Sequence, residues 1–213
     1  MTTALAIIAK APFPGRSKTR LCPPLTGEQA AMLAEAALRD TLAAVLATPV
    51  DRRVLVLDGL EGPWLPAGIE VIPQRGEGLG DRLAAAFDDI GGPTLLVGMD
   101  TPQVVPALLS EGLAALTLGS MAVLGLAPDG GYWAIGLTEP NRKVFRGVPM
   151  SSAHTGQSQL RRLVEIHGRP PAMLAPLRDV DLIEDAREVA AAVPYSRFAA
   201  ALRSIDAGSA IAA

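Results

Sequence analysis

The chain has 213 residues, of which 49% are hydrophobic and 19% charged, a balance that excludes a disordered protein. Its net charge of −3 excludes a broad basic surface, so we expect no nucleic-acid partner. The chain has no apolar run of about 18 residues and no basic leader at its start, so we expect no membrane span and a cytoplasmic location.

The first predicted element is a strand at residues 4–9, where ALAIIA is continuously apolar, as in a strand buried on both faces. The segment KAPFPGRSKTRL, residues 10–21, follows it and gathers cations around a glycine: Lys10, Gly15, Arg16, Lys18 and Arg20. It is not a P-loop, in which glycine and lysine are adjacent. Backbone N–H groups at a glycine turn, with Arg and Lys nearby, nevertheless suit phosphate oxygens. The segment predicts a phosphate site, with a solvated basic loop as the alternative.

A long amphipathic helix is predicted next, over residues 27–47. Thr26 and Gln29 have capping-box spacing at its start, and Pro49 ends it. Two strands follow, at 53–58 and 69–73.

A glycine-rich segment, QRGEGLGDR at 74–82, leads from the third strand into a predicted helix at 79–90. Gln74 has an amide able to read the edge of a base, and the glycines at 78 and 80 allow a flat ligand to approach the backbone. A simple glycine turn before a helix is the alternative reading.

A fourth apolar strand, 93–100, runs directly into Asp100, and a helix is predicted at 102–116. A carboxylate at this position can hold Mg²⁺ or Mn²⁺, which prefer oxygen ligands and bridge to substrate phosphates. The alternative is an ordinary N-cap. Thr101 is a candidate for that cap, which would leave Asp100 free for the metal.

Strands at 121–128 and 131–137 enclose PDGGYW, which places Asp129 in a turn before Tyr132 and Trp133. The two aromatic side chains are candidates for lining a sugar or acceptor pocket, and a plain hairpin turn is the alternative.

The last third of the chain predicts a helix at 157–168, a short strand at 172–177 and helices at 181–193 and 195–204. RDVD places Asp179 and Asp181 on one face if the segment is extended, so either could add a second carboxylate to the metal. A cap at Asp181 is the alternative. His154 is a candidate metal ligand or polar contact, although a lone loop histidine is more often neither.

The alternation of strands and helices predicts an α/β fold with a mostly parallel sheet flanked by helices. We expect one domain at 1–204 and a frayed tail at 205–213. In such sheets ligands bind outside the carboxyl ends of the strands. The segments after successive strands should therefore meet at one edge.

KAPFPGRSKTRL, GMDTP, PDGGYW and the late DVD together resemble the bacterial rSAM/selenodomain-associated family of candidate glycosyltransferases, a domain of unknown function. The family belongs to the GT-A nucleotide-diphospho-sugar transferase superfamily and is distantly similar to molybdenum cofactor and phospholactate guanylyltransferases. The resemblance spans about residues 4–190 and implies a Rossmann-like GT-A fold with a divalent metal. It implies nucleotide phosphates at Gly15, Arg16, Lys18 and Arg20, a base near Gln74, Gly78 and Gly80, metal at Asp100 and Asp181, and an acceptor or sugar at Asp129.

We therefore expect a transferase that uses Mg²⁺ or Mn²⁺ and a nucleotide-activated donor, with a nucleotide sugar as the first candidate. Lys18, Asp100 and Asp129 are the expected catalytic residues, and the acceptor side would comprise Asp129, Tyr132, Ser151 and His154. A nucleotidyltransferase releasing pyrophosphate and a non-catalytic nucleotide-binding module are the alternatives. We expect a small-molecule acceptor. The sequence indicates neither which molecule that is nor an oligomeric state.

Overall fold

The computed structural model describes residues 2–211, with side chains described as far as residue 208. Its seven strands form one sheet in the order β3-β2-β1-β4-β6-β5-β7. The strands are β1 (Ala4–Lys10), β2 (Arg52–Asp58), β3 (Glu70–Pro73), β4 (Thr94–Gly98), β5 (Ala122–Leu126), β6 (Tyr132–Leu137) and β7 (Ala172–Leu174). β6 runs antiparallel to β4 and β5, and every other neighbouring pair is parallel. The predicted α/β fold with a mostly parallel sheet is confirmed.

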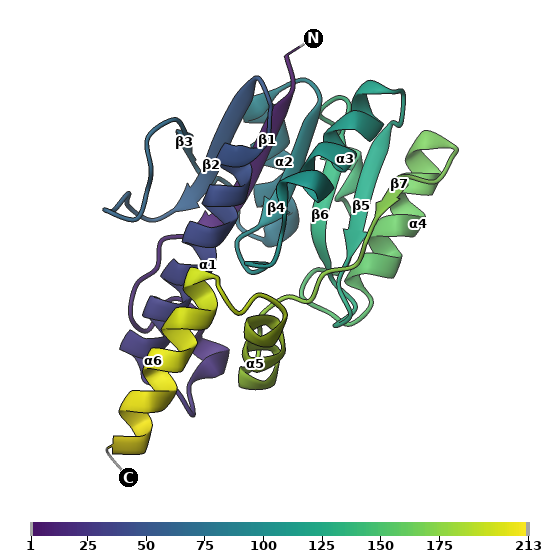
Figure 1. Cartoon of the computed structure of the whole chain (residues 1–213). Coiled ribbons are helices and arrows are strands. Elements are labelled where there is room, and N and C mark those ends of the chain that lie inside the picture. The colour runs from purple at the N-terminus through teal and green to yellow at the C-terminus, as the bar shows by residue number, and fades with distance from the viewer. Residues whose placement is uncertain (1, 212–213) are drawn as a thin grey trace.

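Helices cover both faces of this sheet (Figure 1). They are α1 (Gly27–Ala47), α2 (Leu79–Ile90), α3 (Pro106–Thr117), α4 (Thr155–His167), α5 (Ile183–Ala192) and α6 (Arg197–Ile211), with short 3-10 turns η1 (Thr19–Leu21) and η2 (Arg142–Val144). One apolar core packs α1 and α3 on the sheet, and a second packs α2, α4 and η2 on the opposite face. Each sheet face is thus closed to water, which is why the inner strands read as unbroken apolar runs.

A third apolar cluster lies beyond the carboxyl ends of β1 and β4, where α5, α6 and the first half of α1 pack together (Figure 1). Leu21 and Val180 are both fully buried in this cluster. They belong to the KTRL and RDVD segments, so their burial brings two segments from opposite ends of the chain to the same edge of the sheet.

Most predicted elements are confirmed within a few residues, and the capping box of Thr26 and Gln29 is present. The helix predicted from residue 102 is wrong at its start, because α3 begins at Pro106. Val105 before it is extended, as a residue preceding proline prefers, and proline suits the first helical turn. The final helix also runs further than the expected 195–204, to Ile211. Residues 212–213 of the expected tail lie outside the described residues.

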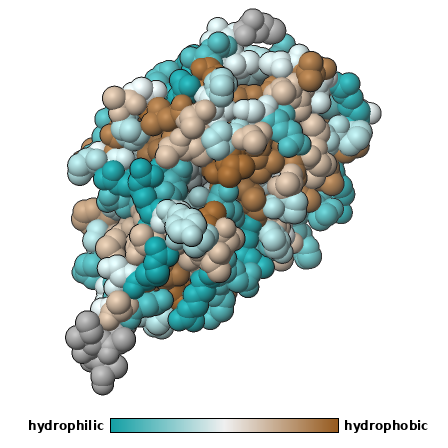
Figure 2. Space-filling model, viewed as in Figure 1, coloured by the Kyte–Doolittle hydropathy of each residue, from teal (hydrophilic) through white to brown (hydrophobic). Residues whose placement is uncertain are grey.

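No helix in residues 2–211 has both the length and the apolar character needed to cross a membrane. On the face seen in Figure 2, hydrophobic and hydrophilic residues are interspersed, and hydrophilic residues prevail over the part that carries α5 and α6. The exposed large apolar side chains come from scattered elements, among them Leu60, Leu118 and Tyr195.

Candidate functional site

A cavity of about 400 Å³ opens at the carboxyl edge of the sheet, and we call it the first cavity. Its volume lies in the range of small-molecule sites, roughly 300–1,000 Å³. The segments that follow β1, β3 and β4 all contribute to its lining, together with the RDVD segment. The first cavity therefore lies at the edge of the sheet that the strand pattern predicted.

The loop after β1 is folded into a compact turn by Ser17, which is buried. The Ser17 hydroxyl donates to the carbonyl of Ala11 at 3.0 Å and accepts from the backbone N–H of Phe13 at 3.2 Å. Gly15 adopts φ +74°, a left-handed conformation that glycine reaches without strain. The turn carries Arg16 and Lys18 to the cavity wall on a fixed backbone.

Lys18 is the most enclosed cation of the cavity, with a side chain only 7% exposed. Its Nζ lies 2.7 Å from Oδ1 of Asp100 and also donates to the carbonyl of Val180. The N–H of Val180 in turn donates to the carbonyl of Asp100 at 3.0 Å. Lys18 thus joins the loop after β1, the end of β4 and the RDVD segment.

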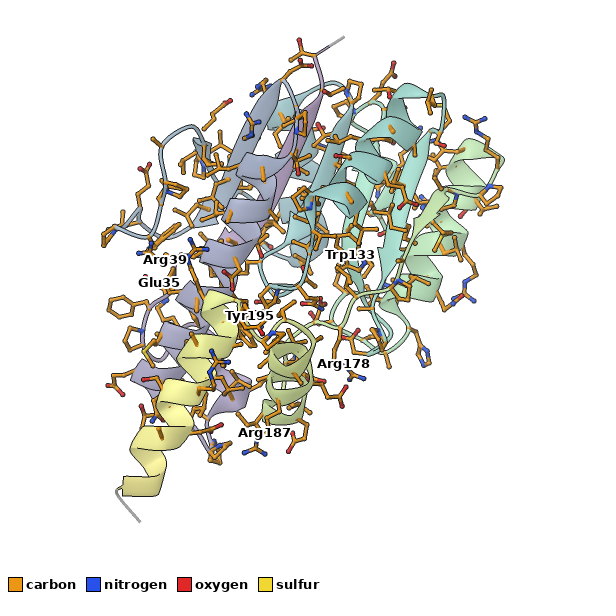
Figure 3. The ribbon with its side chains drawn as sticks, viewed as in Figure 1. Glu35, Arg39, Trp133, Arg178, Arg187 and Tyr195 are labelled. Carbon is orange, nitrogen blue, oxygen red and sulfur yellow. The ribbon has the colours of Figure 1, made fainter. Side chains whose placement is uncertain are left out.

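Two side chains hold the chain that runs from β7 through the RDVD segment. Trp133 of β6, labelled in Figure 3, donates its Nε1–H to the carbonyl of Ala175 at 3.1 Å. Gln103, in the connection from β4 to α3, donates to the carbonyl of Arg178 at 2.7 Å. Because Val180 between them is buried, Asp179 and Asp181 both turn to the cavity, where both contribute to the lining.

Negative charge is concentrated at this wall. Burial, and after it the carboxylate of Asp100, raises the pKa of Asp179 to about 7, with Asp129 and Asp181 acting in the same direction and Lys18 against them. Asp181 is not the helix cap that was the alternative reading. It pairs with Arg20 at 2.7 Å, while Asp185 accepts from the backbone at the start of α5.

The opposite wall contains Gln74 and Arg82. The Gln74 amide nitrogen donates to the carbonyls of Ala9 and Val56 at 2.7 and 3.1 Å, so its donors bridge β1 and β2 rather than facing an open base site. Arg82 donates to Oδ2 of Asp58 at 3.2 Å. Arg82 lines the cavity and was missed in the sequence, although its place in the first turn of the helix after QRGEGLG was a usable signal.

The acceptor-side residues surround the β5–β6 turn. Asp129 is exposed and accepts from the N–H of Gly131 at 2.9 Å, which confirms a tight hairpin turn. The turn docks closely on the loop before α4, since a Cβ at Gly130 would lie 2.0 Å from the carbonyl oxygen of Ala153. Ser151 and His154 belong to that loop and are exposed. Burial raises the pKa of Tyr132 well above its usual value.

The first cavity gathers most of the expected site residues along its wall: Lys10, Arg16, Lys18, Arg20, Gln74, Asp100, Tyr132 and Asp181. Others do not line it, namely Gly15, Gly78, Gly80, Asp129, Ser151 and His154. Gly78 and Gly80 instead line a second cavity on the other side of Leu79. Thr101 is not a helix cap, and its buried hydroxyl has no partner among the described residues.

In the part of the chain that the structure describes, no three acidic, histidine or cysteine side chains are grouped closely enough to hold a metal by themselves. Mg²⁺ commonly takes one or two protein carboxylates and completes its shell with water and substrate phosphates. Lys18 bonds to Oδ1 of Asp100, and Arg20 bonds to Oδ2 of Asp181. The remaining oxygen of each carboxylate accepts no bond from a described residue. These oxygen donors fit an ion shared with a phosphate, not an all-protein cage.

Solved structures share this architecture. A "putative nucleotide-diphospho-sugar transferase" from Desulfovibrio desulfuricans G20 matches with a TM-score of 0.85 at 26% identity, covering 97% of this chain and 96% of that one. The manganese complex of Rv0371c from Mycobacterium tuberculosis H37Rv matches with a TM-score of 0.50 at 22% identity, covering 89% and 97%. The 2-C-methyl-D-erythritol 4-phosphate cytidylyltransferase of Thermus thermophilus matches with a TM-score of 0.54 at 18% identity, covering 90% and 98%. The last two similarities establish the fold alone.

Sequence comparison gives a family. A search of curated proteins found no match. The model of a family described as uncharacterized proteins conserved in bacteria, DUF2064, matches residues 32–152, which is more than half of the chain. The protein with this sheet and this carboxyl-edge cavity is therefore a member of the DUF2064 family.

Proposed function

We propose that the protein is a metal-dependent transferase that uses a nucleotide-activated donor, in the first place a nucleotide sugar. One observation carries the proposal: Lys18 and Asp100, expected to serve phosphate and metal, lie 2.7 Å apart in a cavity that Arg16 and Arg20 also line. A cluster of cations beside a carboxylate suits a diphosphate with its counter-ion. The similarity to the Desulfovibrio protein supports a donor of this class.

Asp100 would hold the metal, with Asp181 or Asp179 as the second carboxylate. When bound, Mg²⁺ or Mn²⁺ supplies positive charge to the donor phosphates. The manganese complex of the structurally similar Rv0371c supports a divalent ion on this fold.

The protein's own groups would act as follows. Lys18 and Arg16 bind the diphosphate and neutralise the charge that grows on it as the bond between the sugar carbon and the phosphate oxygen breaks. A hydroxyl oxygen of the acceptor forms the new bond to the same carbon, and its proton would pass to the carboxylate of Asp129, which does not line the first cavity but is near enough to raise the pKa of Asp179 at its wall. The products are the glycosylated acceptor and a nucleoside diphosphate.

Nucleotidyl transfer is the second candidate, and the free cations favour it. No carboxylate pairs with Lys10 or Arg16 among the described residues, although both line the first cavity beside Lys18 and Arg20. A third phosphate would find unpaired positive charge there. In that reaction a phosphorylated acceptor takes the nucleotide and pyrophosphate leaves.

Product analysis separates the two reactions. The protein is incubated with Mn²⁺ or Mg²⁺ and panels of nucleotide sugars and nucleoside triphosphates, with small-molecule acceptors, and the release of nucleoside diphosphate or pyrophosphate is measured. We expect nucleoside diphosphate from a nucleotide sugar, and none from the Asp100→Asn variant. Pyrophosphate release would establish the second candidate instead. Tight nucleotide binding without any turnover would favour a non-catalytic binding module.

A further inference from the structure

A second cavity of about 630 Å³ lies between the start of α2 and the connection from β6 to α4. Residues 78–81 form one wall, and residues drawn from 142–150 form the other. We propose that this second cavity binds a phosphate group of the acceptor substrate. The proposal deepens the proposed function and rests on it for the word acceptor, but phosphate binding itself can be measured independently.

The charge of the lining carries the first step. Arg142, Lys143 and Arg146 all line the second cavity, whereas Asp81 is its one carboxylate. Arg142 pairs with Asp88, but no carboxylate pairs with Lys143 or Arg146 among the described residues. Both residues are exposed, so these two cations at one cavity are accessible to an anionic ligand.

Those cations stand on a fixed backbone. Gln159 donates to the carbonyl of Val144 and Arg162 to that of Lys143, both at 2.8 Å. Phe145 is buried and stacks on Phe87 of α2, with ring centroids 5.7 Å apart. The cations therefore start from anchored positions, so ordering them on a ligand requires only side-chain adjustment.

Phosphate suits this wall better than a carboxylate does. An Arg fork makes paired hydrogen bonds to phosphate oxygens, and Lys adds a point charge. Gly78, the N-cap of α2 on the opposite wall, has no side chain and no atom within 4 Å of where a Cβ would stand, so a bulky tetrahedral anion can approach the backbone at the start of this helix. Asp81 does not cancel the site, because it is one carboxylate against two cations, Lys143 and Arg146, that no carboxylate pairs with in the described part of the chain.

The second cavity adjoins the first, which is why its ligand would be the acceptor. Leu79 lines both cavities. Tyr132 lines the first, and its hydroxyl lies 3.9 Å from Sδ of Met150, which lines the second. A molecule held by its phosphate in the second cavity would therefore be separated from a donor in the first by about the width of one side chain.

Binding of inorganic phosphate, measured by titration calorimetry at constant ionic strength, tests the proposal. The Lys143→Gln/Arg146→Gln double variant is compared with Arg161→Gln/Arg187→Gln, which removes two exposed cations elsewhere on the surface. Lys18→Gln/Arg16→Gln in both backgrounds removes the phosphate contacts of the first cavity. We expect the Lys143/Arg146 variant to lose phosphate affinity by about tenfold or more, and the control to keep it.

Equal phosphate binding by the Lys143/Arg146 variant and its control would overturn the proposal. An affinity for acetate as high as the affinity for phosphate, measured by the same titration at the same ionic strength, would also overturn it. Arg146→Glu gives a second readout if the double variant folds poorly, since a reversed charge should abolish the phosphate signal.

The proposed function can fail separately. If no donor is turned over but phosphate binding depends on Lys143 and Arg146, the phosphate site stands and the transferase does not. If turnover is found, the double variant should raise KM for a phosphorylated acceptor and leave KM for the donor unchanged. An unchanged acceptor KM would overturn the acceptor role.

Discussion

Lys18 occupies an unusual backbone position at the centre of the first cavity. It has φ 52°, a left-handed conformation that is uncommon outside glycine, at the start of η1. Its side chain is enclosed, and its Nζ bonds to Asp100 and to the carbonyl of Val180. A strained backbone that is held by contacts on three segments is typical of functional positions. A donor phosphate entering the first cavity would meet this ammonium group at the carboxylate that is proposed to hold the metal.

Replacing Lys18 by Gln should weaken nucleotide binding by roughly tenfold or more, because a hydrogen bond to a charged group contributes about 1.5–3 kcal/mol. Calorimetric titration with nucleoside diphosphates in the presence of Mn²⁺ measures the change. Arg187→Gln is the charge-matched control, since Arg187 is exposed on α5 away from the cavity (Figure 3). Equal affinities of the two variants would contradict a phosphate role for Lys18.

Gln74 shows how the hydrogen-bond partners of a side chain can restrict the role that its chemistry allows. The sequence predicted that its amide reads a base, whereas its hydrogen bonds favour a structural role, and a substitution distinguishes the two. In the structure both of its N–H groups are directed to main-chain carbonyls of Ala9 and Val56. The sequence identified the right position at the cavity but could not foresee these partners, because they are 65 and 18 residues away along the chain.

The Gln74→Ala variant should therefore lose about 1–3 kcal/mol of stability, as expected when buried carbonyls lose their donors, while the ratio of affinities for different bases stays unchanged. Urea denaturation gives the stability, and titration with nucleoside diphosphates of different bases gives the ratio. Gln157→Ala, at an exposed position of α4, serves as the matched control. A shifted base ratio with unaltered stability would instead support base reading.

Individual elements were predictable where their signals are local. The capping box of Thr26 and Gln29 lies within four residues, and it marks the start of α1 correctly. The start of α3 was predicted at Pro102, but the helix begins at Pro106. A turn precedes it, in which the N–H of Val104 donates to the carbonyl of Thr101. α6 packs against α1 and α5 through Phe198, Leu202 and Ile205, whereas residues 206–208 are exposed, so no local burial pattern marked the extension to Ile211.

Asp40 of α1 shows how that packing is fixed. Its side chain is 9% exposed and accepts from the backbone N–H groups of Arg197 and Phe198 at the start of α6. Asp40→Ala should lower the free energy of unfolding by about 1–3 kcal/mol, because the first turn of α6 loses its acceptors.

Glu35→Ala is the control on the same helix. Glu35 pairs with Arg39 at 2.8 Å on the surface (Figure 3), and such an i,i+4 pair contributes only about 0.3–0.5 kcal/mol. Urea denaturation curves of both variants measure the difference. Similar losses for the two would mean that Asp40 does not anchor α6.

At the scale of the whole molecule, the sequence predicted the edge of the sheet at which the site lies, but not which side chains pair with one another there. The rule that ligands bind beyond the carboxyl ends of parallel strands led to the segments after β1 and β4. It could not pair Arg20 with Asp181, which lie 161 residues apart, or place Gly78 and Gly80 on a separate cavity. The pairing of Arg20 with Asp181 follows from the burial of their neighbours Leu21 and Val180 in the third apolar cluster, which depends on helices from both ends of the chain.

A site assembled from segments so distant in sequence should couple ligand binding to the stability of the whole fold. A nucleotide ligand at about 100 times its dissociation constant adds about 2.7 kcal/mol, which for a domain of this size raises Tm by roughly 5–11 °C. We expect this rise in thermal unfolding with Mn²⁺ and a nucleoside diphosphate or nucleotide sugar. Removing the metal with EDTA should reverse most of it.

The Asp100→Asn variant distinguishes the contribution of the metal to nucleotide binding from the contribution of Lys18, Arg16 and Arg20. It keeps Lys18, Arg16 and Arg20, so a nucleotide should still raise Tm slightly, but adding Mn²⁺ should raise it no further. The double variant Lys18→Gln/Arg16→Gln should lose the rise in both conditions, because the phosphates then lack their charge partners. If Asp100→Asn responded to Mn²⁺ and nucleotide together as the unaltered protein does, the carboxylate at the end of β4 would not be the metal ligand.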